Sequence, residues 1–199
     1  MIAVLTGDIK NSTEHKTAKW LPILKQALGR YGKEPSDWEI YRGDSFQLQT
    51  TAEQALEASV YIKACIKQIR QLDVRIAIGL GEKTYDAKKV TESNGGAFVN
   101  SGKCFENLKK QNLAIKTPSK TLDEHINLLV ELALLTMDNW TPAISKTVKS
   151  AIENPEMNQR ELASLLGKSQ GNISEELKKA GFDEVQKMIE FYKTQLVHL

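Results

Sequence analysis

Apolar positions in the first 117 residues alternate between strand-like runs and helix-like stripes. The β-prone apolar segments are 2–6, two halves of 38–50, 74–80 and 113–117. Segments with apolar residues at helical spacing are 16–31, 53–70 and 97–110. The resulting order, β-α-β-β-α-β-α-β, predicts an α+β fold. We expect a ferredoxin-like antiparallel sheet with helices on one face, extended by one α-β unit.

Beyond Pro118 no strand pattern recurs. Residues 121–139 form a leucine-rich helical stretch, and Thr141-Pro142 has the sequence of a new helix start. Further helices are expected near 142–153, 158–166, 170–180 and 183–196. The pattern divides the chain into an α+β domain (1–118), a connecting helix (119–140) and an all-α domain (141–199).

Composition is ordinary for a soluble globular protein, with 41% hydrophobic and 26% charged residues and a net charge of +2. The charge gives no global attraction to nucleic acid or membrane, and no apolar run is long enough to span a bilayer. Cys65 and Cys104 are isolated and suit packed thiols in a reducing compartment. The histidines show no ligand spacing, so we expect no zinc site. These features predict a cytoplasmic protein.

Two carboxylates stand where apolar strand segments end or turn. Asp8 follows the first strand, and Asp44 lies in the Gly43-Asp44 turn of the hairpin. Taken singly, Asp8 could cap the next helix and Asp44 could be a plain turn residue. Brought together, they could hold Mg²⁺ or Mn²⁺ against a triphosphate.

Four motifs in order resemble the class III nucleotidyl cyclases and their GGDEF relatives. They are Asp8-Ile9-Lys10-Asn11-Ser12-Thr13, Gly43-Asp44, the strand Arg75 to Gly81, and Gly96 to Asn100. The whole chain also resembles the SatD-type bacterial proteins, through Thr-Gly-Asp-Ile, Tyr-Arg-Gly-Asp-Ser-Phe-Gln, Arg-Ile-Ala-Ile-Gly and the C-terminal helices. That second resemblance implies no activity.

The cyclase resemblance implies a role for each matching position. Metal ligands would be Asp8, Asp44 and the carbonyl of Ile9. Phosphate contacts would come from the loop Lys10, Asn11, Ser12 and Thr13, while Arg42 is either a further phosphate contact or a solvated charge. Asn100 would orient the nucleotide from the partner subunit, so the resemblance also implies a homodimer through this domain. An ordinary helix-start role for Asn100 remains equally open.

Three positions depart from the cyclase pattern. Cys104 stands where cyclases place an Arg that stabilises the transition state, and a thiol cannot replace a charged guanidinium. Ile40 replaces the purine-reading Lys, and Ser45 replaces the second acid of the diguanylate signature. Nearby cations that could compensate for Cys104 are Lys103, Arg42 and Lys10. The residues expected to bind the metal are therefore all present, whereas the residues that cyclases use for catalysis and base recognition are replaced.

Residues 157–181 resemble the helix-turn-helix of bacterial repressors, with Gly167 in the turn. Ser169, Gln170 and Asn172 would begin the recognition helix and contact DNA. Residues 141–199 carry eight basic and eight acidic residues, which weakens the case for phosphate contacts. The alternative is a helical packing or dimerisation module.

The sequence thus favours a cytoplasmic bacterial regulator. A cyclase-like domain would bind a nucleotide with a divalent metal, and a helix-turn-helix would bind DNA or a partner. The second hypothesis is an active metal-dependent nucleotidyl cyclase or nucleotidyltransferase. The third is a structural module without a ligand.

Overall fold

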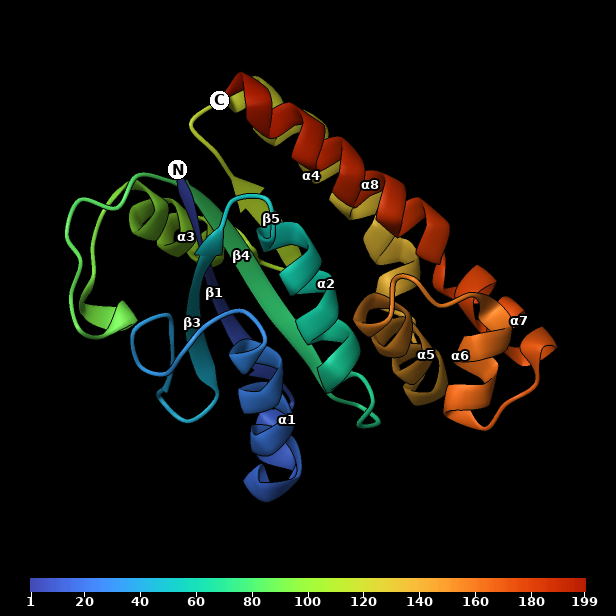
Figure 1. Cartoon of the computed structure of the whole chain (residues 1–199). Helices are drawn as coiled ribbons and strands as arrows, with labels where there is room; N and C mark the ends of the chain where they lie inside the picture. Colours follow the sequence, from blue (N-terminus) through green and yellow to red (C-terminus); the bar gives the residue numbers. More distant parts are fainter.

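The computed structural model describes the backbone of all 199 residues and every side chain except that of His198. A five-stranded sheet has the order β2-β3-β1-β4-β5 (Figure 1). Its strands are β1 (Ile2–Lys10), β2 (Trp38–Tyr41), β3 (Ser45–Thr51), β4 (Asp73–Gly81) and β5 (Leu113–Lys116). The β2-β3, β3-β1 and β1-β4 pairs are antiparallel, whereas β5 runs parallel to β4. The sheet is therefore mixed, and the expectation of a purely antiparallel sheet is wrong at β5, because a helical crossover returns the chain in its original direction.

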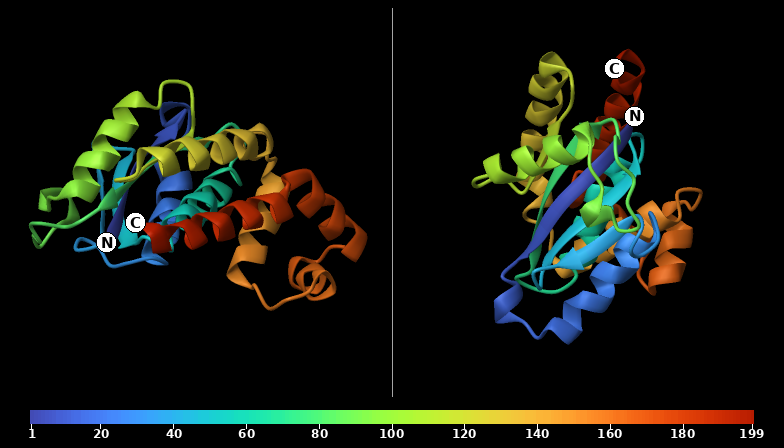
Figure 2. Two further views of the ribbon diagram at one scale, coloured as in Figure 1. Left: turned by 90° about the horizontal axis from the view of Figure 1, so that it is seen from above. Right: turned by 90° about the vertical axis from the view of Figure 1, so that its left-hand side faces the viewer.

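Helices cover both faces of the sheet, so the expected single helical face is also wrong (Figures 1 and 2). The first four helices are α1 (Thr17–Gly29), α2 (Ala55–Ile66), α3 (Gly96–Asn107) and α4 (Lys120–Met137). Helices α1 and α2 share the main core with Leu5 and Ile78, whereas α3 packs on the opposite face, over Val4. Gly79 permits this close approach, because a Cβ there would lie 2.1 Å from the Ser101 nitrogen.

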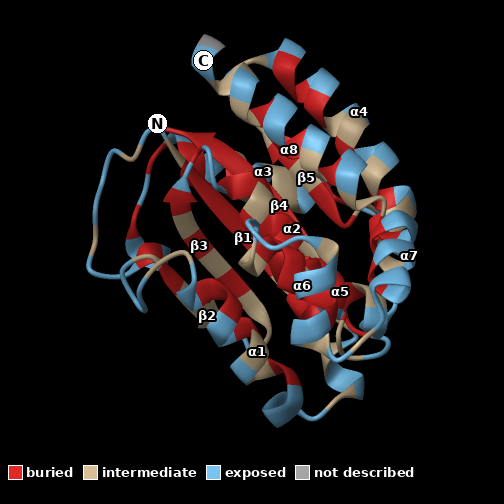
Figure 3. Cartoon of the chain, turned by 45° about the vertical axis from the view of Figure 1, so that its right-hand side comes forward, coloured by how far each residue is buried: buried red, intermediate tan, exposed pale blue. Residues whose placement is uncertain are grey.

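Everything after residue 141 is helical or connecting, at the positions that the sequence predicts. The helices are α5 (Pro142–Glu153), α6 (Gln159–Leu166), α7 (Gln170–Ala180) and α8 (Phe182–Gln195). Helix α8 returns alongside α4 (Figure 1). Its Tyr192 hydroxyl donates to the Ala52 carbonyl at 2.7 Å, and Trp140 Nε1 donates to the Ala180 carbonyl at 3.0 Å. The buried residues consequently form one core across the boundary near 141 (Figure 3).

A buried ion-pair network strengthens this junction. Lys63 Nζ contacts Asp73 at 2.7 Å and Asp138 at 2.6 Å, and Lys67 Nζ donates to the Asp138 carbonyl at 2.8 Å. Burial lowers the pKa of Lys67, but its acidic partners oppose the shift. The network joins α2, the start of β4 and the end of α4. Among the residues that the structure describes, no helix is both long and apolar enough to cross a membrane.

Candidate functional site

Four side chains form a cross-strand row near one end of the sheet. Tyr41, Ser45, Asp8 and Arg75 are successive partners on β2, β3, β1 and β4. Because directly opposed residues point to the same face, the row lies on the face that carries α3. The strand register alone therefore brings Asp8 beside Arg75.

Arg75 binds Asp8 with two nitrogens. Its Nε lies 2.9 Å from Asp8 Oδ1, and its Nη2 donates to Oδ2. The hydrogen bond to Asp8 raises the pKa of Arg75, and the charge of Asp44 adds to the shift. The guanidinium also lies over the ring of Phe105, 5.4 Å from its centroid. The contacts with Asp8 and Phe105 thus fix the position of the Arg75 guanidinium.

A depression of about 410 Å³ opens beside this pair. Its lining residues are Asp8, Ile9, Lys10, Asn11, Arg75, Lys109 and Lys110. Four of the side chains are cationic and one is anionic, so the depression has a net positive charge and suits an anion. Lys10 is held by its donation to Asn112 Oδ1 at 3.0 Å. Neither Lys109 nor Lys110 is recognisable from sequence, because both belong to the connection between α3 and β5.

The loops at this end of the sheet share an unusual backbone conformation. Across the described backbone, the non-glycine residues with positive φ are Asn11 (61°), Arg42 (51°), Gln71 (70°) and Lys109 (47°). Each follows or precedes a strand at this same end. Asn11 Nδ2 donates to the Gln71 carbonyl at 2.8 Å and so ties two of the loops together. Left-handed non-glycine residues are uncommon, and they concentrate at ligand sites.

Asp44 lies near Asp8, but the two residues are not paired in the register of β1 and β3. The register pairs Asp8 with Ser45, and the Ile9 nitrogen donates to the Asp44 carbonyl at 3.3 Å. The Asp44 carboxylate accepts a hydrogen bond from Ser12, just before α1. The two carboxylates therefore come from β1 and from the turn before the adjacent strand β3, at one end of the sheet, and each already has a partner.

A cation at this end would find few protein ligands. Among the residues whose side chains are described, no three or more His, Cys, Asp or Glu gather in a metal-binding group. Asp8, Asp44 and the Ile9 carbonyl could supply part of a shell. Mg²⁺ typically completes such a shell with phosphate oxygens and water. The donor set therefore fits a metal that arrives with a phosphorylated ligand better than a resident ion.

Other predicted residues lie apart from the depression. Thr13 and Arg42 are exposed in neighbouring loops. Asn100 donates to the Leu80 carbonyl at 2.8 Å, near the opposite end of β4 from Arg75. Burial raises the pKa of the Cys104 thiol to about 11, with the Asp123 charge adding to the shift. The lining groups described above do not include Asn100 or Cys104.

The residues expected to contact DNA gather at the start of α7. Gly167 (φ 65°) ends α6, and the Ser169 hydroxyl accepts from the Asn172 nitrogen at 3.2 Å. Gln170 Nε2 donates to Gln159 Oε1 at 3.2 Å, and Ser169, Gln170 and Asn172 are all exposed. A small core of Ala151, Leu162, Ala163, Ile173 and Leu177 holds α5, α6 and α7 together.

The acidic residues of α7 are paired with lysines. Glu176 contacts Lys168 Nζ at 2.6 Å and also accepts from Thr147. Glu175 contacts Lys179 Nζ at 2.6 Å, and this hydrogen bond lowers the pKa of Glu175. Helix α7 itself carries two glutamates and two lysines, so its net charge is close to zero.

A comparison with protein-family models finds no match for the chain, and a search of curated proteins finds no relative. Function is therefore inferred from the chemistry of the sites themselves.

Proposed function

We propose that this protein is a nucleotide-binding regulator whose α+β part holds phosphates at the end of β1. One observation carries the proposal: Lys10, Arg75, Lys109 and Lys110 converge on one depression beside Asp8. Cations from two strands and from the connection between α3 and β5 are costly to hold together without an anion between them, because like charges repel. A di- or triphosphate is an anion of suitable size and charge for a 410 Å³ depression.

In this proposal each group has a distinct task. Arg75 is pre-positioned by Asp8 and presents its guanidinium to a phosphate oxygen, while the lysines neutralise the remaining charge. The loop Lys10–Thr13 borders the phosphates. Asp44, Asp8 and the Ile9 carbonyl would hold a Mg²⁺ or Mn²⁺ ion that arrives with the nucleotide, and the ion would neutralise part of the phosphate charge.

The topology supports a cyclase-like, ferredoxin-like interpretation of this part. The four antiparallel strands have the order β2-β3-β1-β4, and α1 and α2 connect them on a single face. In such a fold the end of β1, which carries Asp8, lies beside the β2–β3 turn, which carries Asp44. This agrees with the proposed kinship to the cyclases and the SatD-type proteins.

An active nucleotidyl cyclase or nucleotidyltransferase is the second candidate, favoured by a specific observation. Arg75, Lys109 and Lys110 are additional cations that could stabilise developing phosphate charge in place of the Arg lost at Cys104. Incubation with nucleoside triphosphates and Mn²⁺, followed by chromatography for pyrophosphate, distinguishes the two. Pyrophosphate released by the wild type and lost in Arg75→Gln would favour the enzyme.

For the C-terminal helices we propose a helix-turn-helix that binds DNA weakly through Ser169, Gln170 and Asn172. Exposure of all three at the start of α7 supports this, and the paired glutamates limit the affinity. Replacing Glu175 and Glu176 with Gln should tighten nonspecific binding in a mobility-shift assay at low salt. Absence of binding by both proteins at tens of micromolar would assign these helices to protein contacts instead.

A thermal-shift screen tests the nucleotide proposal. Nucleoside triphosphates, diphosphates and cyclic nucleotides are compared with and without Mg²⁺. A ligand at a hundred times its dissociation constant should stabilise the protein by about 2.7 kcal/mol. No shift with any phosphorylated ligand at millimolar concentration would reject the proposal.

A further inference from the structure

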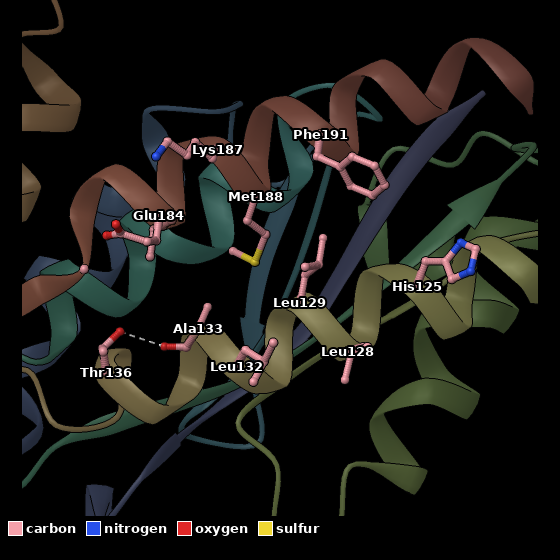
Figure 4. A pocket seen from close by; sticks show the side chains of 12 residues that line it. His125, Leu128, Leu129, Leu132, Ala133, Thr136, Glu184, Lys187, Met188 and Phe191 are labelled. Atoms are coloured by element: carbon pink, nitrogen blue, oxygen red, sulfur yellow. Dashed lines mark hydrogen bonds between the residues drawn. The ribbon is translucent and has the colours of Figure 1, made fainter.

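A large apolar depression, which shares no lining residue with the β1 site, lies in a groove between α4 and α8 (Figure 4). It has a volume of about 810 Å³. Leu128, Leu129 and Leu132 from α4 line one wall, and Val185, Met188 and Phe191 from α8 line the other. An apolar groove of this size on a surface is typical of a site for another helix.

Helix α4 carries two apolar stripes, whereas a helix on the surface of a monomer needs one. The inner stripe is buried in the core: Leu122, Ile126, Val130, Leu134 and Met137. The outer stripe is His125, Leu128, Leu132 and Leu135, at the 3-4-3 spacing of a coiled-coil seam. Its three leucines are 57%, 55% and 70% exposed. The same helix therefore provides both a groove wall and a leucine ridge.

We propose that a second copy of this chain covers the groove, with α4 packed antiparallel against α4 of the copy and α8 against α8. A two-fold contact requires one patch to be complementary to itself, and leucines at 3-4-3 spacing on two antiparallel α4 helices can interdigitate across such an axis. With the axis at the level between Glu131 and Leu132, each Leu128 meets Leu135 of the other copy. The two α4 and two α8 helices then form a four-helix bundle. This interface differs from the cyclase-like dimer expected from sequence, in which Asn100 would reach the nucleotide of the partner subunit.

The charges on the rim of the groove match this symmetry. Helix α8 runs antiparallel to α4, because Gly181 lies beside Thr136 whereas Phe191 lies near the other end of the groove (Figure 4). The level of Leu132 consequently falls between Glu184 and Lys187 on α8. A two-fold axis at that level places Glu184 of each copy opposite Lys187 of the other, which gives two ion pairs.

The projected area of the exposed face of α4 and α8 supplies the larger part of what a dimer needs. Helix α4 has 18 residues, so it is about 27 Å long, and a pair of helices is roughly 20 Å wide. The face then covers roughly 500 Å² in projection, and its accessible area is larger because side chains make ridges and grooves. Stable interfaces bury about 800 Å² per partner.

Sedimentation equilibrium of the full chain tests the proposal. We expect a dimer mass for the wild type between about 1 and 100 μM, and at least a tenfold weaker association for Leu132→Glu. The matched control is Leu165→Glu on α6, because Leu165 and Leu132 are both 55% exposed. The control should remain dimeric, and circular dichroism establishes whether both variants are folded.

Charge reversal provides a second test that leaves the leucines in place. Glu184→Lys and Lys187→Glu should each weaken the dimer, and the double variant should restore it. A monomeric wild type at 100 μM would overturn the proposal and assign the groove to another protein. A dimer that survives Leu132→Glu, or that is unaffected by every charge variant, would overturn the two-fold contact.

Discussion

Arg75 holds Asp8 through two parallel hydrogen bonds between neighbouring strands, at the entrance of a positively charged depression. The arrangement neutralises the Asp8 carboxylate that the sequence assigns to a metal. It also orients a guanidinium toward the space where phosphates would lie. The depression therefore has a net positive charge even though its most visible sequence motif is acidic.

The first prediction concerns the stability of this pair. Arg75→Gln should lower the free energy of unfolding by about 1–2 kcal/mol, because it leaves a carboxylate with a side chain only 20% exposed without its partner. Asp8→Asn should have a smaller cost. In urea unfolding, the double variant should lose less stability than the sum of the single variants. Additive losses would show that the two side chains are not coupled.

The second prediction concerns the contact between α3 and the sheet. Gly79→Ala should destabilise the fold by about 2–3 kcal/mol, because its Cβ would lie 2.1 Å from the backbone nitrogen of Ser101 and 2.3 Å from the carbonyl oxygen of Ala97. The control is Gly102→Ala in α3, where a Cβ meets nothing within 4 Å. That variant should gain about 0.5–1 kcal/mol from helix propensity. Similar melting temperatures for the two variants would contradict the packing.

The third prediction concerns pH and the contact between α2 and α5. Glu153 accepts hydrogen bonds from Tyr61 at 2.6 Å and from Lys149 at 2.7 Å. Burial raises the pKa of Glu153, but these hydrogen bonds lower it by more, so its net shift is downward from 4.5. The unfolded chain then binds the proton more readily. The stabilisation is therefore complete above pH 4.5 and is lost as the pH falls through the lower folded pKa.

Glu153→Gln should accordingly cost about 1 kcal/mol at pH 7, and the difference from wild type should shrink below pH 4. Denaturant unfolding at several pH values measures both quantities. Glu190→Gln is the control, because Glu190 forms an exposed pair with Lys193 that should contribute little. A pH-independent cost for Glu153→Gln would refute the ionic origin of the effect.

The fourth prediction distinguishes the binding of Mg²⁺ from the binding of the nucleotide phosphates. Asp44→Asn should abolish the extra stabilisation that Mg²⁺ gives to a bound nucleotide, while the metal-free protein keeps its melting temperature within a few degrees. The Ser12 hydroxyl can still donate to the remaining amide oxygen. Asp86→Asn, in an exposed loop, should retain the full effect of Mg²⁺. Equal dependence on Mg²⁺ in both variants would remove Asp44 from the metal site.

The hydrophobic pattern predicts most elements because each strand and helix has a clear period. Helices at 142–153 and 170–180 follow from the Thr141-Pro142 and Ser169 starts and from the Gly181 stop, which are local signals. The face that a helix covers is not a local property. Gly79 and Gly81 leave room for α3, but in sequence they only weaken a strand.

The candidate site also combines residues that local sequence signals identify with residues that only the tertiary structure brings together. Asp8 and its loop are recognisable because strand, carboxylate and loop are contiguous. Arg75 reaches Asp8 only through the β1–β4 register, and Lys109 and Lys110 reach the depression only through the crossover to β5. The sequence therefore identifies the acidic residues and Lys10, and tertiary structure adds Arg75, Lys109 and Lys110.

Isothermal titration calorimetry tests the central claim most directly, with the Mg²⁺-nucleoside triphosphate that stabilises best in the thermal screen. The Lys109→Gln/Lys110→Gln variant is compared with Lys178→Gln/Lys179→Gln, another pair of adjacent lysines, exposed on α7. We predict that the first variant binds at least tenfold more weakly than wild type, because two phosphate partners are lost, and that the second binds like wild type. Equal affinity in all three proteins would contradict a phosphate site at the end of β1.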